Sequence, residues 1–288
     1  MGQHTVTVVI PTRNRRGPLK NTICDVLRQA DSSTSVLIIE QSDEETFALV
    51  QSDIAAFNDS RLELIRSETP SLPQARNLGI SLARSQIILF FDDDVRLTPG
   101  CIEAHRLVYE NPLVGGVVGR IRERHVRPNT KKTANYVNWG GRVITNLDGN
   151  TKMPVGTLKG ANMSWRRSVF DEVGGFDDNY LGTAILEDAD LSERARSAGW
   201  ELWFEPQAEL LHLSSPAGGV RQRDLFQTER WRFHNTGYFL RKNRGRRSWL
   251  PLPATFLAIA LCRAHEWRDP AVVGTLMRAL RDGWQSAS

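Results

Sequence analysis

Three adjacent carboxylates, Asp92, Asp93 and Asp94, directly follow the apolar run at 87–91. Like charges this close repel one another, so a packed protein keeps them together when a cation lies between them. In an Asp-x-Asp arrangement the first and third side chains can share one side of the backbone, while the middle one points away. Asp92 and Asp94 are therefore candidate ligands for Mg²⁺ or Mn²⁺. A polar turn after a core strand is the alternative that this stretch leaves open.

Three other places carry side chains that could take part in chemistry. Glu187 and Asp188 precede Leu191 in an acidic helix start, where a carboxylate can serve as a general base or only favour the helix dipole. His212 lies between apolar neighbours and is either a core histidine or a metal ligand. Arg76 lies at a predicted helix start near strand ends, with surface solvation as its alternative.

The elements that would position these residues alternate between strands and helices. Strands are predicted at 5–10, 35–40, 61–65, 86–91 and 114–118, and helices at 18–28, 43–57, 71–84 and from Thr98-Pro99 onward. Such alternation predicts βαβ units and a mostly parallel sheet with right-handed crossovers, which binds ligands at the carboxyl ends of its strands. The composition of residues 122–158 predicts an irregular segment, either a hairpin or a mobile loop that closes over a ligand.

The composition of the 288 residues is that of an ordinary globular protein, with 40% hydrophobic residues and a net charge of +4. Residues 221–288 hold 13 Lys and Arg against 5 Asp and Glu, so the basic charge is confined to the last quarter, which calls for an anionic partner or a solvated face. Three scattered cysteines predict a reducing compartment. We expect no signal peptide and no membrane span, since no apolar run reaches about 18 residues.

The order of these pieces resembles the family 2 glycosyltransferases of the GT-A fold over roughly residues 5–215. The Gly-x-Gly-x-x-Gly and phosphate-loop lysine motifs of other nucleotide-binding proteins are absent. The resemblance rests on five motifs in the family's order and spacing: Val8 to Arg15, Gln74 to Gly79, Phe90 to Asp94, Val173 to Asp177, and Glu187-Asp188 with Arg194.

The resemblance implies a role for each matching position. Asp188 would be the catalytic base, and Asp92, Asp94 and His212 would hold Mn²⁺ or Mg²⁺. The nucleotide-sugar would contact Pro11, Thr12, Arg13, Glu40, Arg76, Asp92 and Asp93, with Glu40 standing where the family usually has Asp and Arg76 beside the base. The acceptor side would include Gly160, Asn162 and Glu187. Gly175 and Asp177 would be structural, and the sequence leaves open whether Asp190 supports Asp188 or faces solvent.

The implied activity is inverting, metal-dependent transfer of a sugar from a nucleoside-diphosphate sugar to an acceptor hydroxyl, in polysaccharide, glycoconjugate or natural-product assembly. UDP is the first expectation for the donor and dTDP the second; the acceptor would be a glycan, a lipid-linked molecule or a small molecule. Two alternatives remain open. A sugar-nucleotide nucleotidyltransferase could use the same paired Asp ligands, but it would want a Gly-rich basic phosphate loop. A non-catalytic nucleotide-sugar-binding module would tolerate loss of the base.

We therefore predict an α/β fold of GT-A type, a Rossmann-like mostly parallel sheet flanked by helices, over residues 1–215. Its nucleotide-sugar-binding half would be 1–110, its acceptor and catalytic half 111–215, and a basic, mainly helical extension would follow at 216–288. The five cations of Arg241–Arg247 precede the apolar run Ala254–Cys262. We predict a cytoplasmic protein without a nucleic-acid partner. Peripheral contact of this cluster with the inner face of the cell membrane is a further hypothesis, and a helix packed on the catalytic domain is its alternative.

Overall fold

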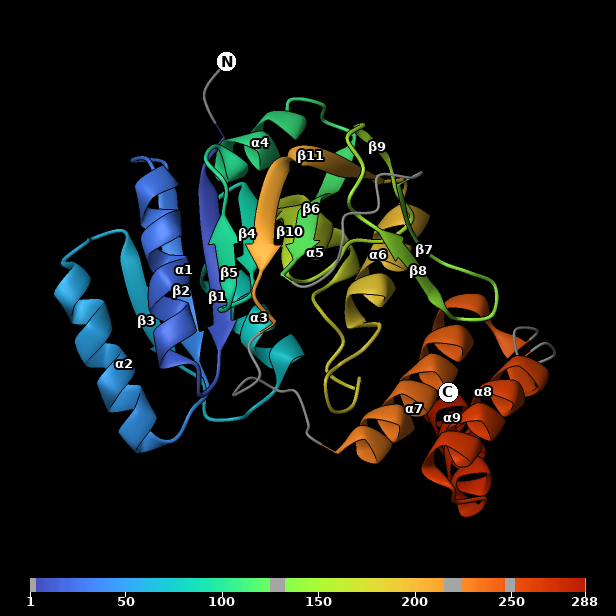
Figure 1. Ribbon diagram of the computed structural model, residues 1–288. Coiled ribbons are helices and arrows are strands. Elements are labelled where there is room, and N and C mark those ends of the chain that lie inside the picture. The colour runs from blue at the N-terminus through green and yellow to red at the C-terminus, as the bar shows by residue number, and fades with distance from the viewer. Residues whose placement is uncertain (1–3, 125–132, 215–223, 247–251, 288) are drawn as a thin grey trace.

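A computed structural model describes residues 4–124, 133–214, 224–246 and 252–287 (Figure 1). The first half of the chain builds strands and helices in alternation, as the sequence pattern predicts. Its elements are β1 (Val6–Thr12), α1 (Arg16–Gln29), β2 (Thr34–Glu40), α2 (Glu44–Phe57), β3 (Leu62–Arg66), α3 (Leu72–Leu82), β4 (Ile87–Phe91), β5 (Val95–Leu97) and α4 (Cys101–Val108).

The second half adds strands from distant parts of the chain and ends in helices. Its elements are β6 (Val114–Glu123), β7 (Ala134–Val137), β8 (Val143–Asn146), β9 (Met153–Pro154), β10 (Asn162–Arg166), α5 (Arg167–Val173), α6 (Glu187–Ser197), β11 (Glu201–His212), α7 (Leu225–Arg244), α8 (Leu252–Trp267) and α9 (Ala271–Ser286). The segment predicted to be irregular therefore contains the end of β6, the antiparallel hairpin β7–β8 and β9.

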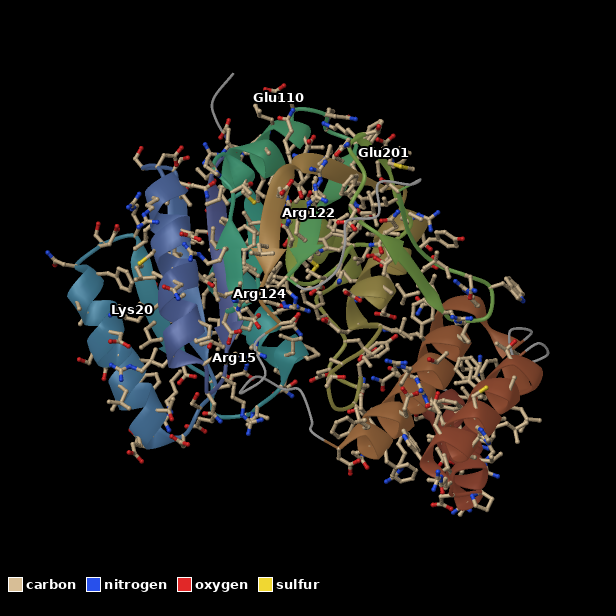
Figure 2. The ribbon with its side chains drawn as sticks, viewed as in Figure 1. Arg15, Lys20, Glu110, Arg122, Arg124 and Glu201 are labelled. Carbon is tan, nitrogen blue, oxygen red and sulfur yellow. The ribbon has the colours of Figure 1, made fainter. Side chains whose placement is uncertain are left out.

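The central sheet runs in the order β3-β2-β1-β4-β10-β6-β11-β5, with β9 paired to β11. Strands β1 to β4 pair in parallel, as do β6 and β11, whereas β10 lies antiparallel between β4 and β6. The sheet is thus mixed, with helices on its faces. The carboxyl ends of β1 and β11 point to the same lower edge in Figure 1, and Arg15, which follows β1, lies at that edge in Figure 2.

Local sequence explains several of the helix starts. Asp43 and Ser71 accept hydrogen bonds from backbone N–H groups in the first turns of α2 and α3, which supplies the N-caps that these helices need. The helix predicted from Thr98-Pro99 onward begins three residues later, at Cys101, after Gly100. Gly100 has a φ of 82°, a left-handed conformation that glycine adopts without steric cost.

Two hydrophobic cores organise the molecule. The larger one fills the space between the sheet and its flanking helices, with Phe90, Phe91 and Trp165 fully buried. The second joins α7, α8 and α9 to the segment that contains Tyr180 and Leu186. This segment precedes the predicted boundary at residue 215, so the C-terminal helices share a core with the chain around α6; the predicted division of the chain stays a prediction.

The C-terminal helices gather at the lower right of Figure 1, on the opposite side of the molecule from α2. Helix α8 packs on α9 and buries Phe256 and Ala260, which agrees with the packed-helix alternative for this apolar run. Among the residues that the structure describes, no helix is both long and apolar enough to cross a membrane.

The basic cluster is largely engaged within the protein. Arg241 lies over the ring of Trp284, and Arg244 donates hydrogen bonds to backbone carbonyls next to β7. Lys242 forms ion pairs with two carboxylates, those of Asp177 and Asp190. Arg246 is exposed, and Arg247 lies outside the described residues. Contact with a membrane through this cluster stays a prediction.

Candidate active site

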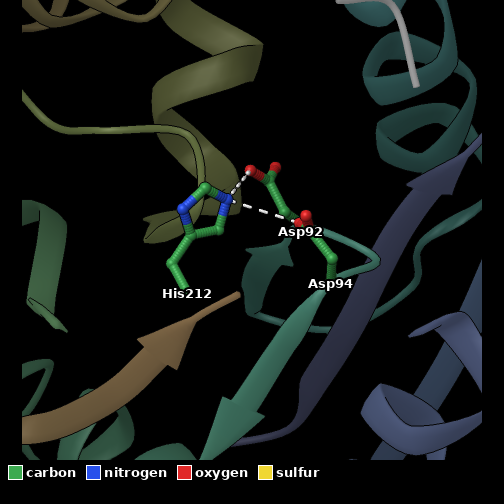
Figure 3. A group of neighbouring side chains, drawn as sticks. All are labelled: Asp92, Asp94 and His212. Atoms are coloured by element: carbon green, nitrogen blue, oxygen red, sulfur yellow. Dashed lines mark ion pairs between the residues drawn. The ribbon is translucent and has the colours of Figure 1, made fainter. Parts of the chain in front are cut away.

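Asp92, Asp94 and His212 meet at the carboxyl edge of the sheet (Figure 3). One ligand atom from each lies within 4.8 Å of the others. The imidazole Nε2 of His212 is 3.3 Å from Asp94 Oδ1 and 3.6 Å from Asp92 Oδ2. Two oxygens and one imidazole nitrogen that converge in this way suit a divalent cation, whose bonds to such ligands are about 2.0–2.2 Å long.

Strand register brings these residues together from positions 118 residues apart along the chain. In the last strand, His212 pairs with Val95 on one side and Glu123 on the other. The backbone N–H of Leu213 donates to the carbonyl of Asp94 over 2.9 Å, which fixes the end of β11 against the Asp cluster. The antiparallel pairing of β5 with β11 thus folds the chain after the cluster back onto the strand that delivers the histidine.

The surroundings of His212 fit a metal ligand. Its Nδ1 lies 3.1 Å from Glu123 Oε2, a carboxylate contact that would orient the ring and leave Nε2 aimed at the two aspartates. Nε2 is buried, and within the described part of the chain it has no hydrogen-bond partner of acceptable geometry. Burial lowers the pKa of His212, but Asp94, Asp92 and Glu123 outweigh it and raise the pKa overall. A field that stabilises positive charge on the ring also stabilises a cation bound beside it.

Asp93 corrects one step of the sequence argument. Its side chain is 4% exposed and accepts hydrogen bonds from the Thr12 hydroxyl at 2.7 Å and from Arg15 at 2.8 Å. Burial, helped by nearby Asp92, raises its pKa to about 6, while Arg15 and Thr12 act to lower it. Arg15 also lies 3.2 Å from Asp94. A protein cation therefore relieves part of the repulsion, and the case for a metal rests on the converging ligands.

Asp188 is the second residue of helix α6 and is held by backbone groups. Its Oδ2 accepts from the N–H of Gly160 at 3.2 Å, and its Oδ1 from its neighbour's N–H at 2.8 Å. Burial raises the pKa of this carboxyl, while Arg76 and the two N–H groups oppose the rise. A half-buried carboxylate with a raised pKa is a suitable proton acceptor.

Arg76 connects the two carboxylate groups of the site. Its guanidinium pairs with Glu187 and lies 4.0 Å from Asp92. Burial raises the pKa of Glu187, with Asp188 adding to the effect and Arg76 opposing it. A Cβ at Gly160 would lie 2.3 Å from Arg76, so glycine leaves room for the guanidinium here.

A cavity of about 540 Å³ joins these groups. Six of the predicted site residues line it: Arg76, Asp92, Gly160, Glu187, Asp188 and His212. We call it the catalytic cavity. Its walls come from the strand ends, the start of α6, the β7–β8 hairpin and the first turns of α7, so the C-terminal helices contribute to the site as well.

Other predicted residues lie elsewhere. Pro11 and Thr12 end β1 and are buried, and Arg13 is half-buried. Glu40 is 1% exposed and accepts from the backbone N–H groups of Gln41 and Ser42, and burial raises its pKa. None of these four is among the residues that line the catalytic cavity. Their contact with a nucleotide stays a prediction.

The expectation that Asn162 faces an acceptor is corrected by its burial. The residue is 0% exposed, and its amide donates to the carbonyls of Arg120 and Ala208. Its Oδ1 lies 2.9 Å from Nε2 of His105. With these partners, Asn162 ties β10 to β6 and β11 and has no group to offer a substrate.

Two site residues were missed by the sequence analysis. Arg15 entered the sequence analysis only as the last residue of the Val8 to Arg15 motif, and its spacing from the Asp cluster along the chain gives no hint of pairing. Glu123 ends β6 inside the segment predicted to be irregular. Only the parallel register of β6 with β11 places it beside His212.

Comparison with known proteins agrees with this geometry. The model of the family described as "Glycosyl transferase family 2" matches residues 7–174, more than half of the chain. The chain belongs to this family. The motifs that suggested the resemblance lie within or just beyond the matched residues.

Named relatives transfer several different sugars. An N-acetylglucosaminyl-diphospho-decaprenol L-rhamnosyltransferase of Mycobacterium tuberculosis is 42% identical over 69 residues, 24% of this chain and 22% of the relative. The Glucosyl-dolichyl phosphate glucuronosyltransferase of Haloferax volcanii is 28% identical over 60% of this chain and 56% of the relative. The O-antigen chain rhamnosyltransferase of Salmonella typhimurium is 24% identical over 81% and 72%, respectively. The chain spans about a fifth of the mycobacterial and about half of the haloarchaeal relative.

Solved structures show the same fold. GalNAc-T7 with UDP, GalNAc and Mn²⁺ superimposes with a TM-score of 0.66 at 16% identity, covering 84% of this chain and 50% of that one. The mannosyltransferase PcManGT from Pyrobaculum calidifontis, in complex with GDP-Man and Mn²⁺, gives 0.60 at 16% identity over 100% and 77%. The fold of this chain is therefore the GT-A glycosyltransferase fold, with a mixed central sheet and C-terminal helices.

Proposed function

We propose that this glycosyltransferase moves a sugar from a nucleoside-diphosphate sugar to a hydroxyl of a lipid-linked glycan acceptor, with inversion at the anomeric carbon and dependence on Mn²⁺ or Mg²⁺. The observation that carries the proposal is that Asp92, His212 and Asp188 line one cavity. A donor diphosphate bound at Asp92 and His212 and an acceptor hydroxyl at Asp188 would therefore meet in the same cavity.

Asp188 is the proposed base. Its carboxylate is oriented by the N–H of Gly160 and its own helix start, so it can accept the proton of the acceptor hydroxyl as that oxygen attacks the anomeric carbon. Attack on the face opposite the diphosphate inverts the configuration. Arg76 is buried beside Glu187 and adjacent to Asp92, where its positive charge supports the arrangement of carboxylates around the donor.

Asp92, Asp94 and His212 would hold the cation, and Glu123 would orient the histidine. A dication bound there supplies Lewis-acid stabilisation of the charge that develops on the departing diphosphate. The Mn²⁺ present in both solved relatives supports a dication as the cofactor class.

A lipid-linked acceptor is favoured by the names of two relatives, which specify diphospho-decaprenol and dolichyl phosphate. The donor base is taken as UDP first and dTDP second, and peripheral contact with a membrane remains part of the proposal. The rival activities, a nucleotidyltransferase or a non-catalytic binding module, lose support from the family match.

The test separates donor binding from transfer. UDP, dTDP and GDP are titrated into wild-type protein with Mn²⁺ and with EDTA, and we expect one of them to bind only with Mn²⁺. Asp94→Ala should lose this metal-dependent binding. Asp188→Asn should keep it and lower turnover of the matching nucleotide-sugar by about 10²-fold or more. Equal binding by Asp94→Ala in Mn²⁺ and EDTA contradicts the metal assignment, and near-normal turnover by Asp188→Asn contradicts the base.

A further inference from the structure

A second cavity, of about 600 Å³, lies between the β7–β8 hairpin, the start of α6 and helices α7 and α8. These elements lie side by side at the lower right of Figure 1. Its walls are mainly apolar, and three arginines line it. The apolar members are Val143, Ile185, Leu186, Phe233, Phe256, Ala258 and Ile259, and the arginines are Arg142, Arg232 and Arg263.

The second cavity borders the catalytic cavity directly. Val143, Ile185 and Leu186 line both of them. Leu186 is followed by Glu187 and Asp188, the carboxylates of the catalytic cavity. An elongated molecule whose hydroxyl reaches Asp188 would therefore continue past these three side chains into the second cavity.

The two cavities differ in charge. Four carboxylates line the catalytic cavity against two cations, Arg76 and Lys159, so carboxylates are in excess there, which suits a cation-dependent donor site. The second cavity is lined by arginines. Two of its arginines, Arg232 and Arg263, share Glu229 as an ion-pair partner.

Arg142 is the remaining arginine of this cavity. It is exposed, and no ion pair to it occurs among the described residues. Because it precedes Val143, it stands next to the junction of the two cavities. A guanidinium at that point matches a phosphate that links the sugar end of a ligand to its apolar remainder.

Helix α8 extends the apolar surface outward. Ala258 and Cys262 line the second cavity, and each is preceded by an exposed leucine, Leu257 at 41% and Leu261 at 54%. Residues four apart lie on one face of a helix, so the two leucines form a strip beside the cavity wall. A chain longer than the cavity would meet apolar side chains on leaving it.

We propose that the second cavity binds the isoprenoid chain and the adjoining phosphate of a lipid-linked acceptor, while the acceptor sugar enters the catalytic cavity. The inference rests on the proposed function, because it assigns the acceptor's apolar part to a site next to the catalytic base. Arg142 recognises the phosphate, and the walls formed by Phe233, Phe256 and Ile259 exclude water from the chain.

The test titrates farnesyl diphosphate into the full chain by calorimetry in EDTA, so that no metal contributes to diphosphate binding. Ala258→Trp places an indole in the cavity from an exposed position on α8, and Thr255→Trp adds the same side chain at an exposed residue that does not line the cavity. We expect Ala258→Trp and Arg142→Ser each to weaken binding about tenfold or more, and Thr255→Trp to bind as wild type. Inorganic diphosphate should bind wild type at least about tenfold more weakly than farnesyl diphosphate.

Nucleoside diphosphate binding with Mn²⁺, measured on the same samples, shows that each variant is folded and tests the proposed function separately. Wild type that binds no nucleoside diphosphate contradicts the proposed function. Wild type that binds a nucleoside diphosphate overturns the present inference alone if it fails to bind farnesyl diphosphate. The same conclusion follows if Ala258→Trp binds farnesyl diphosphate as tightly as Thr255→Trp, or if inorganic diphosphate binds as well as the isoprenoid compound.

Discussion

Replacing Arg76 with methionine should destabilise the protein through the carboxylate that it leaves behind. The side chains of Arg76 and Glu187 are 3% and 4% exposed, so each charge is compensated mainly by the other. Methionine keeps much of the arginine's apolar volume but removes its charge. Glu187 then remains in a buried site beside Asp188, whose negative charge already raises its pKa.

The expected loss is about 3–5 kcal/mol in the free energy of unfolding, the usual result of breaking a buried ion pair by removing one partner. Loss of the guanidinium contact over the Phe176 ring, 5.3 Å from its centroid, adds to it. At about 2–4 °C per kcal/mol, the melting temperature should fall by roughly 6–20 °C. Combining Arg76→Met with Glu187→Gln removes both charges and should restore most of the loss.

The loss should also depend on pH. Burial raises the pKa of Glu187 above its ordinary value of 4.5, and Arg76 is the main influence that lowers it. In Arg76→Met this pKa rises further. A carboxyl with a raised folded-state pKa contributes stability fully below its unfolded pKa and loses that contribution as pH rises through the folded value. Arg76→Met should therefore be closest to wild type near pH 5 and furthest from it near pH 9.

The coupling between the two residues is measured by urea denaturation at several pH values. The proteins compared are wild type, both single variants and the double variant. We expect a coupling free energy of about 2 kcal/mol or more, and no added pH dependence when Arg76→Met is made together with Glu187→Gln. Equal destabilisation by Arg76→Met in the two backgrounds would refute the argument that the pair, and not arginine packing, carries the effect.

Two further predictions concern helix α6. Lys242→Met should lower the free energy of unfolding by about 1–3 kcal/mol, because Asp190 is 0% exposed and would lose a charged hydrogen bond of 2.9 Å. Urea denaturation measures this change. Arg246→Met, at an exposed residue, is the control and should change stability little. Because burial raises the pKa of Asp188, turnover at saturating substrates should fall on acidification at a pH above its ordinary 3.8, since the protonated base accepts no proton. A pH–rate profile that stays flat down to that value would exclude Asp188 as the base.

The parts of the site that follow directly from one strand were predictable from the sequence. An apolar run that ends in Asp92 and Asp94 identifies both a buried strand and its ligand-binding end, because parallel sheets collect their sites there. His212 could be proposed only through the family resemblance. Its neighbours along the chain are apolar, and it is the register of β11 with β5 and β6 that places polar side chains beside it.

The parts that failed depend on contacts between distant strands. The alternation rule made Asp93 face away from the metal side, which it does, yet the side chain meets Thr12 and Arg15 there and not water. Asn162 belongs to a strand that inserts antiparallel between β4 and β6, and this topology buries its amide. Neither composition nor spacing in the sequence indicates the hydrogen-bond partners of Asp93 or those of Asn162.

Contacts within the protein explain part of the excess of basic residues in the last quarter of the chain. The basic final quarter was expected to need an anionic partner or a solvated face, and part of that partner is supplied by carboxylates of residues 177–193. Lys242 pairs with Asp177 and Asp190, and Arg244 with Glu193. Asp190 and Glu193 lie on α6, the helix that begins with the proposed base. The C-terminal helices therefore hold the catalytic helix through buried and half-buried ion pairs, while one wall of the second cavity comes from the same helices. Loss of these pairs should therefore act on the proposed base and on the proposed acceptor site together.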